Sequence, residues 1–283
     1  MIPGLCGVDH ALVGVRDLEG ARTAFQRLGF TITPRGRHIG WGTANYCVMF
    51  QEDYLELLGI LDSNQFTNNL DRFLAKREGL LGLAFASRDV TALRESLADQ
   101  DIPSDGPKDL KRILELPGGE ALPAFSLLYP SPGTTPGLSA FVCQHLTRDL
   151  VWQPHWTKHL NGAVGLHELV TVVDDPGGLA LDYARLFGED QVAVSDGLVR
   201  VQAGACQLIF VLPAGLTDLY PADLALQKVE EPWMAGLTIG VSAIDTTAGH
   251  LRSQGIDLLE TRAGRLLVPP EQACGVLLEF VEA

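Results

Sequence analysis

The chain has 283 residues, of which 46% are hydrophobic and 20% charged, so it is long enough for about two globular domains with buried cores. Its formal charge of −14, with no basic stripe to offset it, argues against a nucleic-acid partner. Five scattered cysteines, no signal-peptide pattern and no apolar run near the roughly 20 residues of a membrane span predict a cytoplasmic protein with reduced thiols and no membrane partner.

The first sixty residues predict a β-α-β-β-β unit. Residues 7–15 alternate as a strand does, and Asp17 is placed to cap a helix whose apolar residues recur at helical spacing. Gly29 ends this helix, Phe30 is expected to open a second strand, and residues 34–40 form a turn-rich connection. Two further strands are expected over residues 41–50 and 54–60, so His10 lies on the first strand and Glu56 on the last.

The same signature, an apolar strand followed by an acidic helix start, recurs along the chain. Asp17 has counterparts in Asp89, Asp175 and Asp245, and each is followed by a helical stripe and further strand-like runs. We therefore predict an α+β fold of four β-α-β-β-β units. Two such units would close a curved sheet around a solvent-filled interior.

A segment rich in Trp, His and Pro separates the second unit from the third. We predict a first domain over residues 1–147, a linker over 148–162 and a second domain over 163–283.

Paired units with a histidine on a first strand and a glutamate on a fourth resemble the vicinal oxygen chelate superfamily, and most of all its glyoxalase-like domain (glyoxalase-3-like) family. The likeness is carried by Val8-Asp9-His10 with Asp17-Leu18, by residues 36–45, by Tyr54-Leu55-Glu56-Leu57, by Gln144-His145-Leu146-Thr147 and by Asn161-Gly162-Ala163. The resemblance implies two domains of the glyoxalase/bleomycin-resistance/dioxygenase type. It does not specify the reaction, because this superfamily hosts many chemistries on one scaffold.

The resemblance also implies a metal site. In the superfamily, ligands come from the first and fourth strands of paired units, which here gives His10 and Glu56. Aligning Asp89 with Asp17 places Gly82 opposite His10, so one usual ligand is missing. The last strand of the second unit ends in Gln144 and His145, either of which could supply the third ligand, and His145 is the one expected. Two imidazoles and a carboxylate suit a divalent iron, manganese, zinc or nickel ion with open positions for a substrate. The plainer interpretation is a hydrogen-bonded histidine and a solvated glutamate.

Substrate contacts are predicted near this site. His38 lies in a glycine-rich segment that either approaches a ligand closely or only connects two strands. The expected substrate-binding residues are His38, Trp41, Thr43, Asn45 and Gln144.

The second half offers fewer metal ligands. The Asp175 and Asp245 alignments place Glu168 and Thr238 opposite His10, and Glu279 lies on the last strand. We predict a structural or substrate-capping half, with a site at His167, Glu168 and Glu279 as the weaker alternative.

These residues predict a metal-dependent enzyme of the lyase, isomerase or dioxygenase type, acting on a small organic substrate with vicinal oxygens. Glu56 is the expected catalytic residue and would shuttle a proton, as the resemblance to glyoxalases implies. The alternative is a metal-free protein that sequesters a small molecule, as bleomycin-resistance relatives do, and the missing ligands at Gly82 and Thr238 favour it. The chain is expected to be a monomer or a homodimer.

Overall fold

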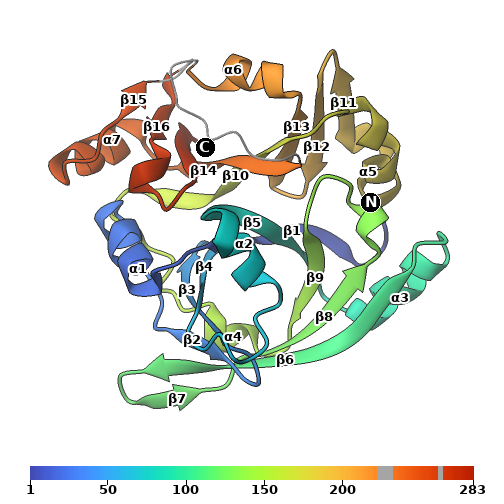
Figure 1. The fold of residues 1–283 in the computed structure, drawn as a ribbon, viewed down its shortest axis with the longest axis horizontal. Coiled ribbons are helices and arrows are strands. Elements are labelled where there is room, and N and C mark those ends of the chain that lie inside the picture. Colours follow the sequence, from blue (N-terminus) through green and yellow to red (C-terminus); the bar gives the residue numbers. More distant parts are fainter. Residues whose placement is uncertain (222–231, 261–263) are drawn as a thin grey trace.

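The computed structural model of the chain describes residues 1–221, 232–260 and 264–283 and arranges them around two mixed β-sheets (Figure 1). Sheet A contains β1 (Leu5–Gly14), β2 (Gly36–His38), β3 (Thr43–Met49), β4 (Tyr54–Ile60), β5 (Gly79–Ser87), β6 (Ser104–Leu116), β7 (Gly119–Ala121), β8 (Ala124–Pro130) and β9 (Ala140–His145). Sheet B contains β10 (Ala163–Val172), β11 (Val192–Ser195), β12 (Leu198–Ala203), β13 (Cys206–Val211), β14 (Trp233–Val241), β15 (Leu259–Glu260), β16 (Leu266–Val268) and β17 (Leu277–Glu282).

The two sheets have similar strand orders, and each is built around a central antiparallel pair, β1–β5 in sheet A and β10–β14 in sheet B. Sheet A runs β2-β3-β4-β1-β5-β9-β8-β6-β7, and sheet B runs β11-β12-β13-β10-β14-β17-β16-β15. In each unit the last strand lies parallel to the first, as β4 does to β1 and β9 to β5. The predicted α+β fold of four β-α-β-β-β units is confirmed, and the units pair in chain order.

Helices follow the first strand of each unit. They are α1 (Leu18–Arg27), α3 (Val90–Ala98), α5 (Ala180–Phe187) and α7 (Ile244–Ser253), with the shorter α2 (Leu70–Lys76), α4 (Arg148–Val151) and α6 (Leu216–Leu219) elsewhere. Asp17 and Asp89 cap α1 and α3 by accepting hydrogen bonds from backbone N–H groups of the first turn, as predicted from the sequence. No helix in the described part of the chain is long and apolar enough to span a membrane.

Sheet A closes on itself. Besides its pairing with β3, β2 pairs with β6, which sets His38 opposite Arg112 and joins the two ends of the sheet. In Figure 1 the strands of sheet A form a ring in the lower half of the view, with α2 drawn across it. This closure makes the inside of sheet A an enclosed space.

The second strand of the first unit differs from the sequence prediction. Phe30 does not open a strand; its ring is buried and packs against Phe25 and Phe50. The strand is β2, inside the segment predicted to be a turn, because Gly36 and Arg37 find partners on both β3 and β6. Only long-range pairing reveals such a short strand.

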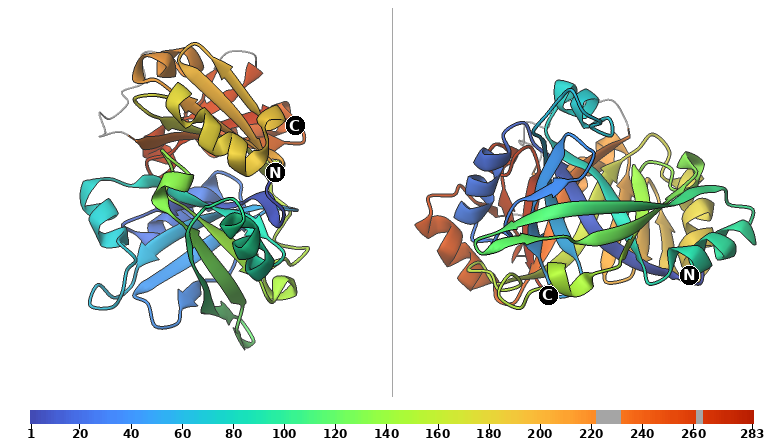
Figure 2. Two further views of the ribbon diagram at one scale, coloured as in Figure 1. Left: turned by 90° about the vertical axis from the view of Figure 1, so that its right-hand side faces the viewer. Right: turned by 90° about the horizontal axis from the view of Figure 1, so that it is seen from below.

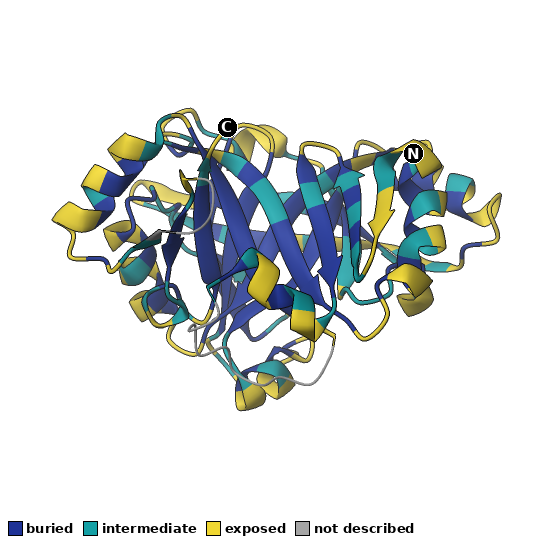
Figure 3. Cartoon of the chain, turned by 90° about the horizontal axis from the view of Figure 1, so that it is seen from above, coloured by how far each residue is buried: buried dark blue, intermediate teal, exposed yellow. Residues whose placement is uncertain are grey.

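The two sheets share a hydrophobic core. One buried cluster includes Val13 and Leu83 of sheet A together with Leu169, Leu237 and Phe280 of sheet B. Figure 2 shows the two halves stacked, and Figure 3 shows that most strand residues are buried while the outer helices expose one side. The opposite, inner face of sheet A therefore remains to carry the site.

Candidate active site

The inside of sheet A encloses a cavity of about 320 Å³. Leu70 of α2 and the preceding residues 67–69 border it. Its polar and ionisable lining includes His10, His38, Thr43, Asn45, Tyr54, Glu56, Arg112, Tyr129 and Cys143. Its apolar lining includes Leu12, Leu58, Leu81, Leu110, Phe125, Leu127 and Phe141.

His10 lies between two carboxylates. The register of β1 is irregular between Val8 and His10, and Asp9 and His10, which a regular strand would point to opposite faces, are in contact there. His10 Nδ1 lies 2.7 Å from Asp9 Oδ2, and His10 Nε2 lies 3.4 Å from Glu56 Oε2. Tyr54 stacks on the imidazole with ring centroids 4.3 Å apart. The ring is thus fixed through Nδ1, with Nε2 directed at Glu56.

His38 approaches the same carboxylate from β2, at the pairing of β2 with β6 that closes sheet A, which we call the seam. Its Nδ1 lies 2.8 Å from Thr43 Oγ1, and its Nε2 lies 3.9 Å from Glu56 Oε1. Burial lowers the pKa of His38 to about 4, so the imidazole is neutral near pH 7 and keeps a lone pair.

Glu56 is a buried, ionised acid. Burial alone would raise its pKa, but His10, His38 and the amide of Asn45, which donates a hydrogen bond to Oε1, together lower it. Two imidazole Nε2 atoms and a carboxylate therefore converge on one wall of the cavity.

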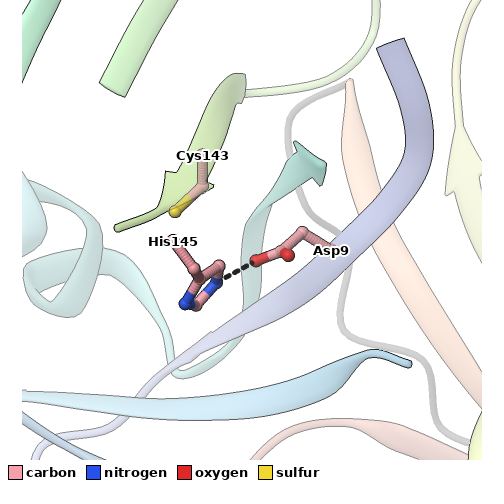
Figure 4. A group of neighbouring side chains, drawn as sticks. All are labelled: Asp9, Cys143 and His145. Atoms are coloured by element: carbon pink, nitrogen blue, oxygen red, sulfur yellow. Dashed lines mark hydrogen bonds and ion pairs between the residues drawn. The ribbon is translucent and has the colours of Figure 1, made fainter. Parts of the chain in front are cut away.

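A second set of possible metal ligands lies on the Nδ1 side of His10, away from Glu56. The donor atoms of Asp9, Cys143 and His145 all lie within 4.8 Å of one another (Figure 4). His145 Nε2 is 3.0 Å from Asp9 Oδ2, and aromatic rings of Phe125 and Trp152 surround the imidazole. Burial raises the pKa of the Cys143 thiol well above its usual value, which disfavours the thiolate that metals bind.

The structure does not bring His145 to the His10–Glu56 pair. Asp9 lies between the two histidines on the Nδ1 side of His10, whereas Glu56 lies on the Nε2 side. Gln144 does not line the cavity either: its amide bonds Arg88 O and the Val90 N–H at the start of α3. The expected substrate residues His38, Trp41, Thr43 and Asn45 all line the cavity.

Two usual ligand positions cannot bind a metal. Gly82 pairs with Leu12, and a Cβ at Gly82 would lie 2.4 Å from the Ser139 carbonyl oxygen. Strand register also places Phe141 at the position of Glu56, because Phe141 pairs with Ala84 as Glu56 pairs with Leu12. The second unit therefore contributes an aromatic wall instead of ligands.

Sheet B has an arginine where a metal would lie. Arg265 Nη1 lies 2.7 Å from both Glu168 Oε2 and Glu279 Oε2, and Thr238 also bonds both carboxylates. The guanidinium satisfies this pair of acids, and His167 is 4.0 Å from Glu168. A metal site at His167, Glu168 and Glu279 would have to displace this ion pair.

The register of sheet B also corrects one alignment. Glu168 pairs with Thr238 and Val170 pairs with Gly236, just as His10 pairs with Ala84 and Leu12 with Gly82. Gly236, and not Thr238, therefore corresponds to His10 in the fourth unit. The Asp-based alignment was two residues off because it assumed equal spacing from strand to helix.

Three residues at or beside the site were not predicted from the sequence. Asp9 and Arg112 are buried and charged, and Cys143 lines the cavity. The Asp-His pair in the sequence is a signal for an oriented imidazole. Arg112 had no such signal, because its inward position depends on the pairing of β6 with β2.

Comparison with known proteins agrees with the fold. The sequence profile of a glyoxalase-like domain matches residues 8–187, which cover nearly all of sheet A and continue through β10 and α5. No curated protein sequence matches the chain.

Three solved structures with similar folds are distant from this chain in sequence. A hypothetical protein from Staphylococcus aureus is 12% identical, with a TM-score of 0.67 over 98% of this chain and 99% of that chain. A mutant of 4-hydroxymandelate synthase from Streptomyces coelicolor is 12% identical, with a TM-score of 0.61 over 99% and 93%. A xylose isomerase-like TIM barrel/4-hydroxyphenylpyruvate dioxygenase fusion protein is 13% identical, with a TM-score of 0.56 over 99% and 49%. At these identities the likeness shows the fold alone.

Proposed function

The chain belongs to the glyoxalase-like domain family of the vicinal oxygen chelate superfamily, and we propose that it is a metal-dependent enzyme acting on a small organic substrate with vicinal oxygens. The reaction is of the lyase, isomerase or dioxygenase type. His10, His38 and Glu56 would hold the divalent ion, so His38 takes the place predicted for His145 from the sequence.

One observation carries the proposal. Both imidazoles are held through Nδ1, by Asp9 and by Thr43, and both present Nε2 to the carboxylate of Glu56, at 3.4 and 3.9 Å. Metal-binding histidines are typically held in this way, by a hydrogen bond from the second ring nitrogen. A lone pair on His10 Nε2 would repel Glu56 unless a proton or a metal ion lay between them. Atoms bound to one ion at about 2.1 Å lie roughly 3–3.5 Å apart, close to the spacing here.

The types of ligand atom limit which metal ions the site can bind. Two imidazoles and one carboxylate suit iron, manganese, zinc or nickel and leave positions open for a substrate. Such an ion would polarise a bound substrate oxygen and stabilise negative charge that develops on it.

Glu56 also has the properties of a base. Its carboxylate is ionised and faces the cavity, where it could accept a proton from a bound substrate. The apolar and aromatic side chains that line the cavity lower the polarity around Glu56, which strengthens these interactions.

Elemental analysis tests the metal site. The purified full-length protein is measured before and after loading with iron, manganese, zinc and nickel, beside His10→Ala, His38→Ala and Glu56→Gln. We expect near-stoichiometric metal in the wild type and loss of it in each variant. His155→Ala, at an exposed histidine outside the cavity, is the control and should retain the metal.

Cys143→Ser separates the two possible ligand sets. It should retain metal if the ion lies at His10, His38 and Glu56, and it should lose metal if the ion lies at Asp9, Cys143 and His145. A wild type that binds none of the four metals after loading would contradict the metalloenzyme proposal.

A second candidate function is metal-free binding of a small molecule. The observation that favours it is Phe141, an aromatic side chain where a second carboxylate ligand would stand. In that case the cavity would bind its ligand with equal affinity before and after removal of metal by a chelator.

A further inference from the structure

We propose that Arg112 binds an acidic group of the ligand, and that the ligand is therefore an organic acid with an apolar body. The inference rests on the proposed function only in placing the ligand in the same cavity. It does not require that a metal be bound.

Arg112 is buried, and its guanidinium has only weak partners, one of which is the Phe125 ring, whose centroid lies 5.3 Å from Cζ. Its residue is 3% exposed and lines the cavity from β6. Nη1 donates a hydrogen bond to Cys47 Sγ at 3.4 Å, and Nε has no hydrogen-bond partner among the described residues. Within the described part of the chain no carboxylate forms an ion pair with it. A thiol is a weak acceptor, so most of the donor capacity of this guanidinium is unused.

A buried cation without a paired anion is costly to the folded protein. Glu56 acts on Arg112 through space, but its oxygens are engaged by Asn45, His10 and His38. By contrast, Arg265 in sheet B pairs with two glutamates. The counter-charge of Arg112 must come from elsewhere, and the cavity is the space it faces.

The seam of sheet A places this charge beside the metal ligands. Arg112 pairs with His38 across β2 and β6, so both side chains lie on the inner face. An acidic group on Arg112 would thus lie next to His38 and Glu56. A guanidinium binds a carboxylate through two parallel hydrogen bonds, which fixes the ligand's orientation as well as its charge.

The rest of the cavity wall indicates the chemical nature of the rest of the ligand. Leu110, Phe125, Leu127, Tyr129 and Phe141 come from β6, β8 and β9 and form one apolar and aromatic surface beyond Arg112. Such a surface favours an aromatic or branched aliphatic body.

Calorimetric titration of the full-length protein tests the proposal. The probes are 3-phenylpropanoate, 2-naphthoate and octanoate, each beside its neutral primary amide, with protein that has been loaded with manganese and with chelator-treated protein. We expect the wild type to bind at least one acid more than about tenfold more tightly than its amide. Arg112→Met should abolish this preference and leave amide binding unchanged, whereas Arg112→Lys should keep part of it.

The matched control is Arg37→Met. Arg37 is on the same seam, but its guanidinium is bonded to Glu115 outside the cavity, so the preference for the acid should persist. Tm provides a second readout: Arg112→Met should be as stable as the wild type or more so, because an unpaired buried charge is removed.

Three results would overturn the proposal. They are a wild type that binds no acid more tightly than its amide, an Arg112→Met variant that keeps the preference, and a variant with lowered Tm that loses acid and amide alike. Metal content measured on the same samples keeps the two proposals apart. A wild type without metal that still prefers the acid would contradict the metalloenzyme and support the role of Arg112.

Discussion

At the scale of single residues, the site depends on Asp9, a side chain that never faces the cavity. Burial would raise the pKa of Asp9, but His145 and His10 outweigh it and hold this pKa well below its usual value. The resulting carboxylate accepts a hydrogen bond at Oδ2 from each histidine. Asp9 therefore fixes the ring of His10 without being a ligand to the proposed ion.

Replacing Asp9 with Asn tests this positioning role. We expect metal affinity to fall about tenfold to hundredfold, because the His10 ring loses the anionic partner that orients it and raises its basicity. Competition against a chelating dye measures the change. Asp174→Asn, at an exposed acid before α5, is the control. Equal affinity in Asp9→Asn and wild type would contradict the role.

Asp53 gives a prediction about pH and stability. It accepts a hydrogen bond from the Leu166 N–H of sheet B, and burial, aided by the charges of Asp9 and Glu52, raises its pKa from 3.8 to about 7. Between those values the folded state holds a proton that the unfolded state has lost, so this group's contribution to stability falls as pH rises. By pH 8 the loss relative to pH 4 is roughly 2–4 kcal/mol.

Urea unfolding of Asp53→Asn and wild type from pH 4.5 to 8.5 measures it. The difference between the two isolates Asp53, because histidines with lowered pKa, such as His38, act in the opposite sense in both proteins. The variant should gain stability relative to wild type as pH rises, while Glu95→Gln, at an exposed acid of α3, should not. Parallel curves would show that Asp53 does not titrate in this range.

Some residues of the site could be predicted from the sequence and others could not, depending on where they lie in the fold. His10, Glu56 and the cavity residues His38, Trp41, Thr43 and Asn45 belong to one unit, where strand periodicity indicates which side chains share a face. His145 and Gln144 were placed from the end of a strand, where an uncertainty of a few residues decides which way a side chain points. Arg112 depends on sheet closure, which local patterns do not indicate.

At the scale of elements, β5 runs close to a neighbouring chain segment at the position in the second unit that corresponds to His10. A Cβ at Gly82 would meet the Ser139 carbonyl oxygen at 2.4 Å, and one at Gly236 in sheet B would meet Tyr220 Oη at 2.0 Å. In both sheets the position of His10 is closed to any side chain in the later unit.

Gly82→Ala should therefore destabilise the protein by about 1–3 kcal/mol, because backbone must move to admit the methyl group. Gly118→Ala is the matched control, since no atom lies within 4 Å of its Cβ position, and it should change stability by less than about 0.5 kcal/mol. Chemical denaturation measures both. Equal stability of the two variants would mean that β5 shifts freely and that Gly82 is not constrained by packing.

Helices and strands were predicted correctly where they are long enough to show a clear periodicity of apolar residues. The Asp-capped helices α1 and α3 and the strand β4 lie where sequence periodicity placed them. The strand β2 was missed because it has only three residues and because one of its two partners, β6, is supplied by another unit.

At the scale of the whole molecule, the two sheets have different interiors. Sheet A encloses the cavity, whereas the inner face of sheet B packs Leu216 and Tyr220 against Ile209 and Leu277. The outer faces share one hydrophobic core. We propose that residues 1–147 and 163–283 are separate domains in architecture and a single unit in folding.

Calorimetry tests this cooperativity. Because the core in common would be exposed if either half unfolded alone, we expect one endotherm whose van't Hoff and calorimetric enthalpies agree. Two endotherms would show that each sheet unfolds independently.

The most direct test of the metal centre is an anomalous difference map from crystals soaked with zinc or manganese. We predict one peak about 2–2.3 Å from His10 Nε2, His38 Nε2 and a Glu56 oxygen, absent from Glu56→Gln crystals soaked in the same way. A peak beside Cys143 and His145, or no peak in sheet A at full soaking, would contradict it.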